Sequence, residues 1–378
     1  MAAFNPHFTI GVLGGGQLGR MLIQAGINLD LNFQVLDPDA QAPCAGIARF
    51  TQGKLTDYET VMAFGKTCDI ITIEIENVNT KALIDLEKAG KKVFPQPAVI
   101  ELIQDKRVQK QFFEDNQIPT APFVLVNNKE DVAKHENFLP AVNKLGKEGY
   151  DGRGVQVIKT KADLNKAFDA PGLLEKWIPF EKEIAVIVSR NALGEVAVYP
   201  AVEMVFHPEA NLVEYLFSPA QVETEIAQQA EAIARKVITS LNMIGLLAVE
   251  MFVTKEGEVL VNEVAPRPHN SGHQTIEGNV TSQYEQHLRA ILTLPMGSTA
   301  LLAPSAMVNL LGEEGFTGSA CYEGLEEVLK AEGVYVHLYG KKTTKPFRKM
   351  GHVTIVDKDL NSLKKKANFV KQTLKVKA

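Results

Sequence analysis

The stretch "LLAVEMFVTKEGEVLVNEVAP", residues 246–266, predicts two apolar β-strands joined by a tight turn at its Glu-Gly step. In this hairpin Thr254 faces Val259, and counting back along both strands brings Glu250 opposite Glu263. Facing residues of antiparallel strands have Cβ atoms about 4.5–5.5 Å apart, and like charges at that distance are destabilising. Two carboxylates in such apolar strands therefore need a cation or a shared proton.

The carboxylate pair predicts a metal site formed by Glu250 and Glu263. Hard oxygen ligands suit Mg²⁺, with Mn²⁺ as a possible substitute, and Mg²⁺ commonly bridges one or two carboxylates to substrate phosphates. Asn262 adjoins the pair, but strand alternation points its side chain to the opposite face unless the strand bulges. The alternative is a slip in register that leaves one glutamate in solvent.

A glycine-rich stretch near the start, "GVLGGGQLGR" (residues 11–20), fits the pattern G-x-G-x-x-G. It lies between a strand expected at 9–13 and a helix expected at 17–27. Glycines let a ligand approach the backbone, and the N-terminus of a helix attracts an anion. Asp37 ends the next strand, where an NAD-binding domain has its ribose-binding acid. The same pattern also fits a tight turn that binds nothing.

A second glycine-rich stretch, "EGYDGRGV" (residues 148–155), suits phosphate chemistry in a chain that has no Walker motif. Gly149, Gly152 and Gly154 free the backbone, and Arg153 adds a planar cation for bidentate anion contacts. Together with a metal site, these residues favour nucleoside triphosphate chemistry. An ordinary hairpin turn is the alternative.

Length and composition set the broad class. A chain of 378 residues predicts two or three domains. Its net charge of −5, without a basic block, does not favour a nucleic-acid partner. The three cysteines are far apart, which speaks against a disulfide framework or zinc site and fits a cytoplasmic protein. A run of 18 apolar residues is absent, so no membrane span is expected.

The order of expected elements indicates several units. Strands and helices alternate over the first hundred residues, with one strand at 69–75, and this alternation predicts a parallel sheet. A polar helix at 105–116 leads into a small α+β lobe with a helix at 161–168. A long strand is expected at 196–203, and a smaller C-terminal unit begins at Pro304.

Six motifs occur in order along the chain. They are "GGGQLGRM" (14–21), "EIENV" (74–78), "GYDGRG" (149–154), "EKWIPFEKE" (175–183), "NEVAPRPHNSGH" (262–273) and "KPFRKMGH" (345–352). Together they resemble the ATP-grasp superfamily, and within it the N5-carboxyaminoimidazole ribonucleotide synthetases, the ATP-dependent carboxylating enzymes of bacterial purine biosynthesis. The resemblance covers nearly the whole chain.

The resemblance implies a fold of mixed α/β and α+β class, the ATP-grasp fold. Residues 1–104 would form a Rossmann-like parallel-sheet domain that binds substrate. Residues 105–298 would form the ATP-grasp domain, with a lid lobe at roughly 118–178, and residues 299–378 a C-terminal domain that completes the substrate site.

The resemblance also implies roles for individual residues. The opening loop would hold the ribonucleotide and a C-terminal basic cluster its 5′-phosphate, and these substrate-binding residues are Gly15, Gly16, Gln17, Leu18, Glu76, Tyr150, Lys341, Arg348 and Lys349. ATP would lie between the lid lobe and the hairpin, with Glu175 facing the adenine amino group. The ATP-binding residues are Lys106, Lys144, Gly149, Tyr150, Gly152, Gly154, Glu175, Lys176, Trp177, Ile178, Glu183, His207, Asn262 and Glu263. The catalytic residues, which hold bicarbonate or steer the amine proton, are Asp151, Arg153, Arg267, His269 and Asn270.

The implied reaction carboxylates 5-aminoimidazole ribonucleotide with ATP and bicarbonate, through carboxyphosphate, and releases ADP and phosphate. The expected partners are these small molecules and, by family habit, a second copy of the chain in a homodimer, without nucleic acid or membrane. Three alternatives remain: formate-dependent glycinamide ribonucleotide transformylase, an NAD(P)-dependent oxidoreductase, and a catalytically silent nucleotide-binding module.

The sequence departs from the family pattern at a few positions. Lys345-Pro346-Phe347-Arg348-Lys349 stands where the family commonly has R-P-G-R-K, so a turn with Phe347 in place of glycine is expected to differ. The surroundings of Lys144 and of His207 also depart from the usual pattern.

Overall fold

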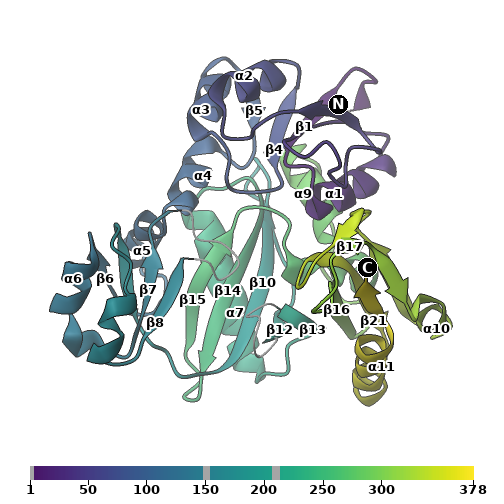
Figure 1. Cartoon of the computed structure of the whole chain (residues 1–378). Helices are drawn as coiled ribbons and strands as arrows, with labels where there is room; N and C mark the ends of the chain where they lie inside the picture. Colours follow the sequence, from purple (N-terminus) through teal and green to yellow (C-terminus); the bar gives the residue numbers. More distant parts are fainter. Residues whose placement is uncertain (1–3, 148–153, 207–212) are drawn as a thin grey trace.

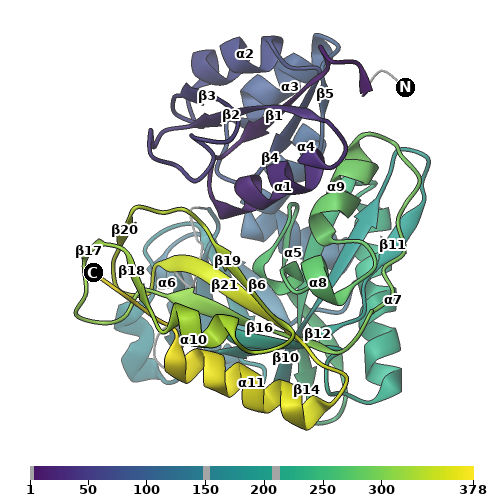
Figure 2. The same cartoon turned by 90° about the vertical axis from the view of Figure 1, so that its right-hand side faces the viewer.

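The computed structural model describes residues 4–147, 154–206 and 213–378. The predictions for Gly149, Tyr150, Asp151, Gly152, Arg153 and His207 fall outside these residues. Figure 1 shows an N-terminal unit above, a small lobe to one side, and a large curved sheet that runs between that lobe and the C-terminal helix. Figure 2 shows the N-terminal unit above the rest of the molecule from a second side.

The N-terminal unit is the expected parallel sheet flanked by helices, with strand order β3-β2-β1-β4-β5. Its strands are β1 (Thr9–Leu13), β2 (Asn32–Asp37), β3 (Arg49–Gln52), β4 (Ile70–Ile73) and β5 (Lys92–Val93). Its helices are α1 (Gln17–Ile27), α2 (Tyr58–Lys66), α3 (Thr80–Lys88) and α4 (Pro97–Gln104). Strand β4 is shorter than the predicted 69–75 because pairing with β1 ends at Ile73. Glu74 therefore lies at the carboxyl edge of the sheet, where parallel sheets bind ligands.

The small lobe follows helix α5 (Lys106–Asp115) and is an antiparallel sheet of order β6-β9-β7-β8. Its elements are β6 (Phe123–Val126), α6 (Lys129–Lys134), η2 (Glu136–Phe138), β7 (Ala141–Leu145), β8 (Val155–Ile158), η3 (Lys161–Lys166) and β9 (Gly172–Lys176). The helix predicted at 161–168 is a shorter 3₁₀ helix, held by i to i+3 bonds such as Asp163 N–H to Thr160 C=O at 3.0 Å.

The large sheet has the order β15-β14-β10-β12-β13-β16-β21-β19, with β11 paired to β10. Its strands are β10 (Phe180–Arg190), β11 (Val196–Val198), β12 (Val202–Phe206), β13 (Val213–Ser218), β14 (Gly245–Thr254), β15 (Val259–Ala265), β16 (Ser305–Leu311), β19 (Val334–Leu338) and β21 (Lys349–Val356). The strand predicted at 196–203 is two strands because Pro200, which lacks an N–H donor, interrupts it.

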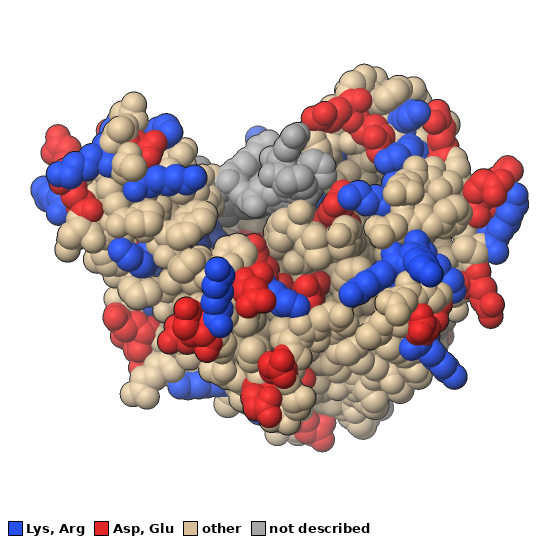
Figure 3. Space-filling view, turned by 90° about the horizontal axis from the view of Figure 1, so that it is seen from below, with Lys and Arg blue, Asp and Glu red and all other residues tan. Residues whose placement is uncertain are grey.

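Helices and short strands cover this sheet and its ends. They are α7 (Thr224–Ser240), η4 (Asn270–Gly272), α8 (Thr275–Gly278), α9 (Gln283–Ile291), β17 (Gly318–Ser319), β18 (Cys321–Glu323), α10 (Leu325–Leu329), β20 (Thr343–Thr344), α11 (Leu360–Thr373) and β22 (Lys375–Lys377). Apolar residues of α7 pack against β10 and β14 in the largest core cluster. Figure 3 shows acidic and basic side chains interspersed over the face seen from below.

Helix α9 joins the units together. Tyr284 and Leu288 of α9 pack with Met21 and Leu22 of α1 in one buried cluster. Beside them, His287 Nε2 lies 2.9 Å from Thr72 Oγ1 of β4, and both side chains are fully buried. The glycine-rich loop is therefore fixed next to the large sheet by a shared core.

The hairpin confirms the predicted glutamate pair, although part of the predicted register is wrong. Glu250 does face Glu263, but Val253, not Thr254, faces Val259. Near the turn the pairing is shifted by one residue from the prediction: Thr254 N–H bonds to the Glu258 carbonyl at 2.9 Å, so that three residues form the turn. A bulge at Asn262 restores the pairing, so that two one-residue departures cancel.

Candidate active site

The two hairpin glutamates meet at a partly buried, charged face. Lys106, the first residue of α5, donates to Glu263 Oε2 at 2.6 Å. That cation holds the pKa of Glu263 below its usual range, whereas burial and the neighbouring Glu263 raise the pKa of Glu250. Glu183, on the adjacent strand β10, has its pKa raised to about 7 by burial and by Glu263. The pair thus accommodates a cation, and an ammonium group now stands beside it.

The donor set fits a hard divalent ion. Facing carboxylates supply oxygen ligands, which Mg²⁺ prefers. Within the described ranges no group of three or more His, Cys, Asp or Glu side chains is arranged to hold a metal. A metal at this pair would therefore need further oxygen ligands, as a nucleotide phosphate supplies.

Lys144 on β7 faces the same region from the small lobe. Its Nζ lies 2.6 Å from Glu175 Oε2 and donates to Asn262 Oδ1 at 3.0 Å. Because β15 bulges at Asn262, this side chain faces Lys144. Strict alternation along the strand would have pointed it to the opposite face.

Lys110 is a buried residue of this network that the sequence interpretation missed. Its Nζ lies 2.7 Å from Glu175 Oε1, and only 2 % of the residue is exposed. The signal was available, because Lys106 and Lys110 are four residues apart on one helix and so lie on the same face.

The expected adenine linker runs along the end of β9. Trp177 N–H bonds to the Pro140 carbonyl at 3.0 Å, and the Ile178 carbonyl accepts from Phe180 N–H at 2.9 Å. Lys176 Nζ donates to the Phe138 carbonyl at 3.1 Å, so its charge points into the lobe. Trp177 is 38 % exposed.

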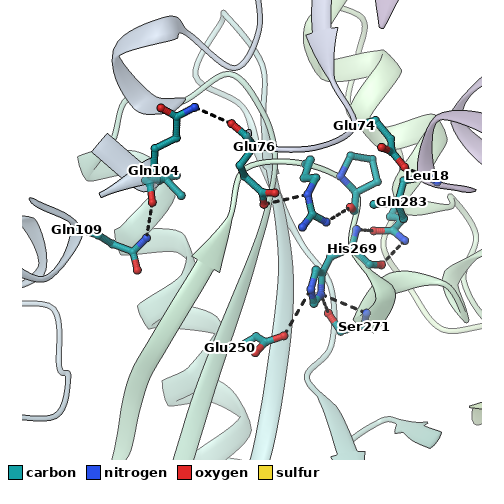
Figure 4. A network of polar contacts seen from close by, with 12 residues as sticks. Leu18, Glu74, Glu76, Gln104, Gln109, Glu250, His269, Ser271 and Gln283 are labelled. Atoms are coloured by element: carbon teal, nitrogen blue, oxygen red, sulfur yellow. Dashed lines mark hydrogen bonds and ion pairs between the residues drawn. The ribbon is translucent and has the colours of Figure 1, made fainter. Parts of the chain in front are cut away.

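The loop after β15 connects Glu250 to the N-terminal unit, as Figure 4 shows. His269 Nε2 lies 3.5 Å from Glu250 Oε1, and Arg267 Nε lies 2.9 Å from Glu76 Oε1. Burial and the nearby Arg267 lower the pKa of His269 to about 3, so this imidazole is neutral at physiological pH. The side-chain amide of the adjacent Asn270 is buried, and neither its oxygen nor its nitrogen has a hydrogen-bond partner among the described residues.

Gln283 fixes the backbone of this loop. Its side-chain oxygen accepts from His269 N–H at 2.9 Å, and its side-chain nitrogen donates to the His269 carbonyl at 2.7 Å. A Cβ atom on Gly272 would lie 2.4 Å from the Gln283 oxygen, so only glycine leaves room for this clamp. No sequence motif identified Gln283.

The glycine-rich loop holds carboxylates of its own chain. Leu18 N–H donates to Glu74 Oε1 at 3.2 Å, and Gly15 N–H donates to Asp37 Oδ2 at 2.7 Å. A Cβ atom on Gly16 would lie 2.4 Å from Glu74 Oε1. The anion at the start of α1 is therefore Glu74, and Asp37 bonds to the loop itself, which speaks against the dinucleotide interpretation. Gln17 is the first residue of α1.

The C-terminal basic cluster lies around the start of β21. Lys341 Nζ donates to the Lys349 carbonyl at 2.7 Å, and Arg348 donates to the Thr343 carbonyl at 2.8 Å. Burial raises the pKa of Glu74 to about 7 against the lowering effects of Arg267 and Lys341, so the cluster reaches the glycine loop electrostatically. Phe347 has φ +62°, in the left-handed region that favours glycine.

Models of known protein families match all three units of the chain. Residues 7–104 match the ribonucleotide synthetase preATP-grasp domain, 111–284 the ATP-grasp domain, and 305–366 the phosphoribosylaminoimidazole carboxylase C-terminal domain. Within residues 4–147, 154–206 and 213–378, no helix is long and apolar enough to cross a membrane.

Two curated relatives cover most of the chain. It is 40 % identical to the N5-carboxyaminoimidazole ribonucleotide synthase of Bacillus subtilis, over 93 % of this chain and 92 % of that protein. It is 39 % identical to the phosphoribosylaminoimidazole carboxylase of Ogataea methanolica, over 97 % of this chain but 69 % of that longer protein.

Solved structures agree with these matches. The N5-carboxyaminoimidazole ribonucleotide synthetase of Thermotoga maritima superposes with a TM-score of 0.90 at 43 % identity, covering 98 % of this chain and 99 % of that one. The Aspergillus clavatus synthase, in complex with ADP and 5-aminoimidazole ribonucleotide, has a TM-score of 0.87 at 33 % identity, covering 97 % and 100 %. The predicted family and ATP-grasp fold are confirmed: the chain belongs to the N5-carboxyaminoimidazole ribonucleotide synthases, a family of ATP-dependent ligases.

Proposed function

We propose that Glu250 and Glu263 hold Mg²⁺ on the triphosphate of ATP, and that this complex drives the family's reaction. The reaction is the ATP-dependent carboxylation of 5-aminoimidazole ribonucleotide. The observation that carries the metal assignment is the pair of facing, partly buried glutamates with the Lys106 ammonium 2.6 Å from Glu263. When bound, Mg²⁺ would neutralise charge on the transferring phosphoryl group.

The nucleotide would lie between the small lobe and the hairpin. Lys106 and Lys144 both reach the hairpin side of this space and would contact the phosphates once a ligand replaces their present partners, Glu263 and Asn262. Glu175, with linker residues 176–178, would face the adenine, and Glu183 would accept from the ribose. Gly154, the described end of the second glycine-rich stretch, has φ +73°, a conformation suited to a tight loop over phosphates.

Bicarbonate would bind between Arg267, His269 and Asn270. Arg267 supplies a fixed positive charge, and the neutral His269 supplies a hydrogen bond without a competing charge. The buried Asn270 amide, without a partner among the described residues, is the observation that supports an absent ligand here. Leaving such an amide unpaired would cost about 1–3 kcal/mol for each polar atom.

The ribonucleotide would lie between the glycine loop, Glu76 and the basic cluster. Gly15, Gly16, Gln17 and Leu18 would line its pocket, while Lys341, Arg348 and Lys349 would neutralise its 5′-phosphate. Tyr150, Asp151 and Arg153 keep the roles that the resemblance implies, contact with the amine and with bicarbonate, and His207 that of a phosphate neighbour.

The chemistry then needs three steps with balanced atoms. A bicarbonate oxygen attacks the γ-phosphorus, and the bond from that phosphorus to ADP breaks to give carboxyphosphate. Carboxyphosphate releases CO₂ and leaves the attacking oxygen on inorganic phosphate. The exocyclic amine of the ribonucleotide adds to CO₂ and loses a proton, with Asp151 as its acceptor, to give the carbamate.

An ADP-release assay tests this proposal. The chain is expected to release ADP with bicarbonate and 5-aminoimidazole ribonucleotide, and not with glycinamide ribonucleotide plus formate. Glu263→Gln should reduce the rate about a hundredfold or more, whereas Glu214→Gln, which removes a remote ion pair with Lys371, should not. ADP release with formate and glycinamide ribonucleotide, or full activity of Glu263→Gln, would contradict the proposal.

Two further features belong to the proposal. A cytoplasmic, reducing location is supported by Cys44, Cys68 and Cys321, which are all free thiols. A homodimer follows from family habit, and a molar mass measured by light scattering would test it.

A further inference from the structure

Lys110 is the innermost charge of the proposed ATP site and has no role in the proposed reaction. It lies one turn after Lys106 on α5, but its side chain is only 3 % exposed against 18 % for Lys106. Besides its ion pair with Glu175, Lys110 donates a hydrogen bond to Thr120 Oγ1. Protein atoms thus surround its ammonium group, which is placed to act on Glu175 and not on a ligand.

The two oxygens of Glu175 have different partners. Oε1 lies 2.7 Å from Lys110 and Oε2 lies 2.6 Å from Lys144. The Lys144 side chain is 10 % exposed and also bonds to Asn262. Lys144 is therefore the partner that can move to an incoming triphosphate, whereas Lys110 cannot leave.

Lys110 is itself anchored to the opposite wall. Thr120 Oγ1, its second partner, donates to the Val261 carbonyl at 2.7 Å, next to Asn262 on β15. The chain of contacts runs from Glu175 on β9, through Lys110 on α5, to the hairpin. This arrangement fixes the carboxylate relative to both walls of the proposed nucleotide site.

We propose that Lys110 is a positioning residue, which stays on Glu175 when Lys144 transfers to the phosphates and so keeps that carboxylate aimed at the adenine amino group. A buried carboxylate that lost both lysines would be strongly disfavoured, so a resident counter-ion is what allows Lys144 to exchange partners. This inference rests on the proposed function, in which Glu175 reads the base and Lys144 binds phosphate.

The choice between ATP and ITP tests the inference. ITP has a carbonyl where ATP has the amino group, so a fixed Glu175 carboxylate accepts from ATP and repels ITP. Binding of each magnesium nucleotide can be followed by the fluorescence of Trp177, the only tryptophan, which lies two residues after Glu175. In Lys110→Met the affinity for ATP should fall about tenfold, because the charge-assisted hydrogen bond from the adenine amino group to the Glu175 carboxylate is lost. The affinity for ITP, which lacks that amino group, should change little. A purely structural role would weaken both nucleotides equally.

A double-mutant cycle and controls complete the experiment. In a Glu175→Gln background, Lys110→Met should no longer change the ATP-to-ITP ratio, because Lys110 acts through Glu175. Lys110→Arg should restore most of the ratio. If Lys110→Met fails to fold, Lys110→Gln, which keeps a donor for Thr120, takes its place. Lys366→Met, which breaks the 2.8 Å pair with Asp357 in the C-terminal unit, should leave the ratio unchanged.

The outcomes separate the two claims. If the unmodified chain does not prefer ATP to ITP, the proposed adenine site is wrong. If it does and Lys110→Met keeps the preference, or if the effect persists in Glu175→Gln, the role of Lys110 is wrong while the adenine site stands.

Discussion

A single residue, Glu74, decides which part of the substrate the glycine-rich loop can bind. A loop of this type usually receives an anionic ligand at the helix N-terminus. Here the Glu74 carboxylate accepts from Leu18 N–H at 3.2 Å and lies where a side chain on Gly16 would stand. A substrate phosphate is thus expected at the C-terminal lysines, while the loop meets the neutral, hydroxyl-bearing part of the ribonucleotide.

Gly16→Ala tests this arrangement. The new methyl group would lie 2.4 Å from Glu74 Oε1 and push the carboxylate away from the helix. We expect a loss of about 1–3 kcal/mol in the free energy of unfolding and a higher KM for the ribonucleotide. Gly46→Ala, where nothing lies within 4 Å of the added Cβ, is the matched control. Equal behaviour of the two variants in denaturant unfolding and steady-state kinetics would contradict the arrangement.

The charge of Glu74 predicts a pH dependence of stability. Burial raises its pKa to about 7, above the 4.5 of the unfolded chain. The folded state therefore binds more protons between these values, and the contribution of Glu74 to the free energy of unfolding falls as pH rises from about 4.5 through 7. Glu74→Gln removes that slope, so the variant should gain about 2–3 kcal/mol relative to the unmodified chain between pH 5 and pH 8. Urea unfolding at both pH values measures the difference, and Glu87→Gln, on an exposed helix face, provides the baseline. A difference that does not change with pH would contradict the assignment.

At the scale of elements, helix α9 positions the loop after β15, which carries the proposed bicarbonate site. The first residue of the helix, Gln283, bonds to both backbone groups of His269, and Gln286 makes the same two bonds, each 2.9 Å, to Gly297 away from the site. The helix thus presents two similar backbone clamps, of which only one holds a proposed catalytic residue; Gln283 also contacts His273 Nδ1 at 3.2 Å.

Gln283→Leu and Gln286→Leu form a matched pair. Gln286→Leu loses its two bonds to Gly297, and Gln283→Leu loses its two bonds to His269 and a longer one, 3.2 Å, to His273 Nδ1, so each should cost at least about 2–3 kcal/mol of stability. Only Gln283→Leu should lower kcat/KM for bicarbonate, about ten- to a hundredfold, because a displaced His269 no longer holds its ligand in reacting geometry. Equal activity of the two stable variants would show that the clamp is structural only.

The hairpin shows how far sequence reasoning reached. Alternating apolar residues and a Glu-Gly turn were sufficient to identify both strands and the Glu250–Glu263 pair. The bulge at Asn262 was left open, because a bulge responds to partners from another unit, here Lys144. The strand predicted at 69–75 and the helix predicted at 161–168 are both shorter in the structure for a similar reason. Contacts with neighbouring elements, not local propensity, decide where a strand or helix ends.

Of the proposed site, the family motifs point to residues that are expected to touch ligands but not to those that position them. Lys110 was overlooked although its spacing from Lys106 was visible in the sequence. Gln283 and Thr120 had no local signal, since each acts through contacts with residues far away in the chain. The roles of all the predicted site residues, among them 148–153 and His207, remain predictions.

At the scale of the whole molecule, the middle and C-terminal units share one sheet. Strand β13 pairs with β16 from Ser218↔Ser305 to Tyr215↔Val308, and the two strands are labelled beside one another in Figure 1. The predicted boundary between residues 298 and 299 therefore separates strands that are hydrogen-bonded neighbours. The domain limits themselves stay a prediction.

A chain that ends at residue 298 tests this continuity. Truncation would expose the edge of β13 and the apolar Tyr215 and Phe217, which pack against the C-terminal core. Unpaired, apolar strand edges promote association, so we expect aggregation or loss of cooperative unfolding, measured by size-exclusion chromatography and circular dichroism. A monomeric fragment with a single sharp thermal transition would contradict this expectation.

The most direct test of the central claim follows the oxygen of bicarbonate. If ATP activates bicarbonate through carboxyphosphate, turnover with [¹⁸O]bicarbonate and 5-aminoimidazole ribonucleotide must leave one labelled oxygen in each inorganic phosphate released, because the attacking oxygen stays on phosphorus. Mass spectrometry of the phosphate measures this transfer. Phosphate that forms at the normal rate without the label would contradict the account.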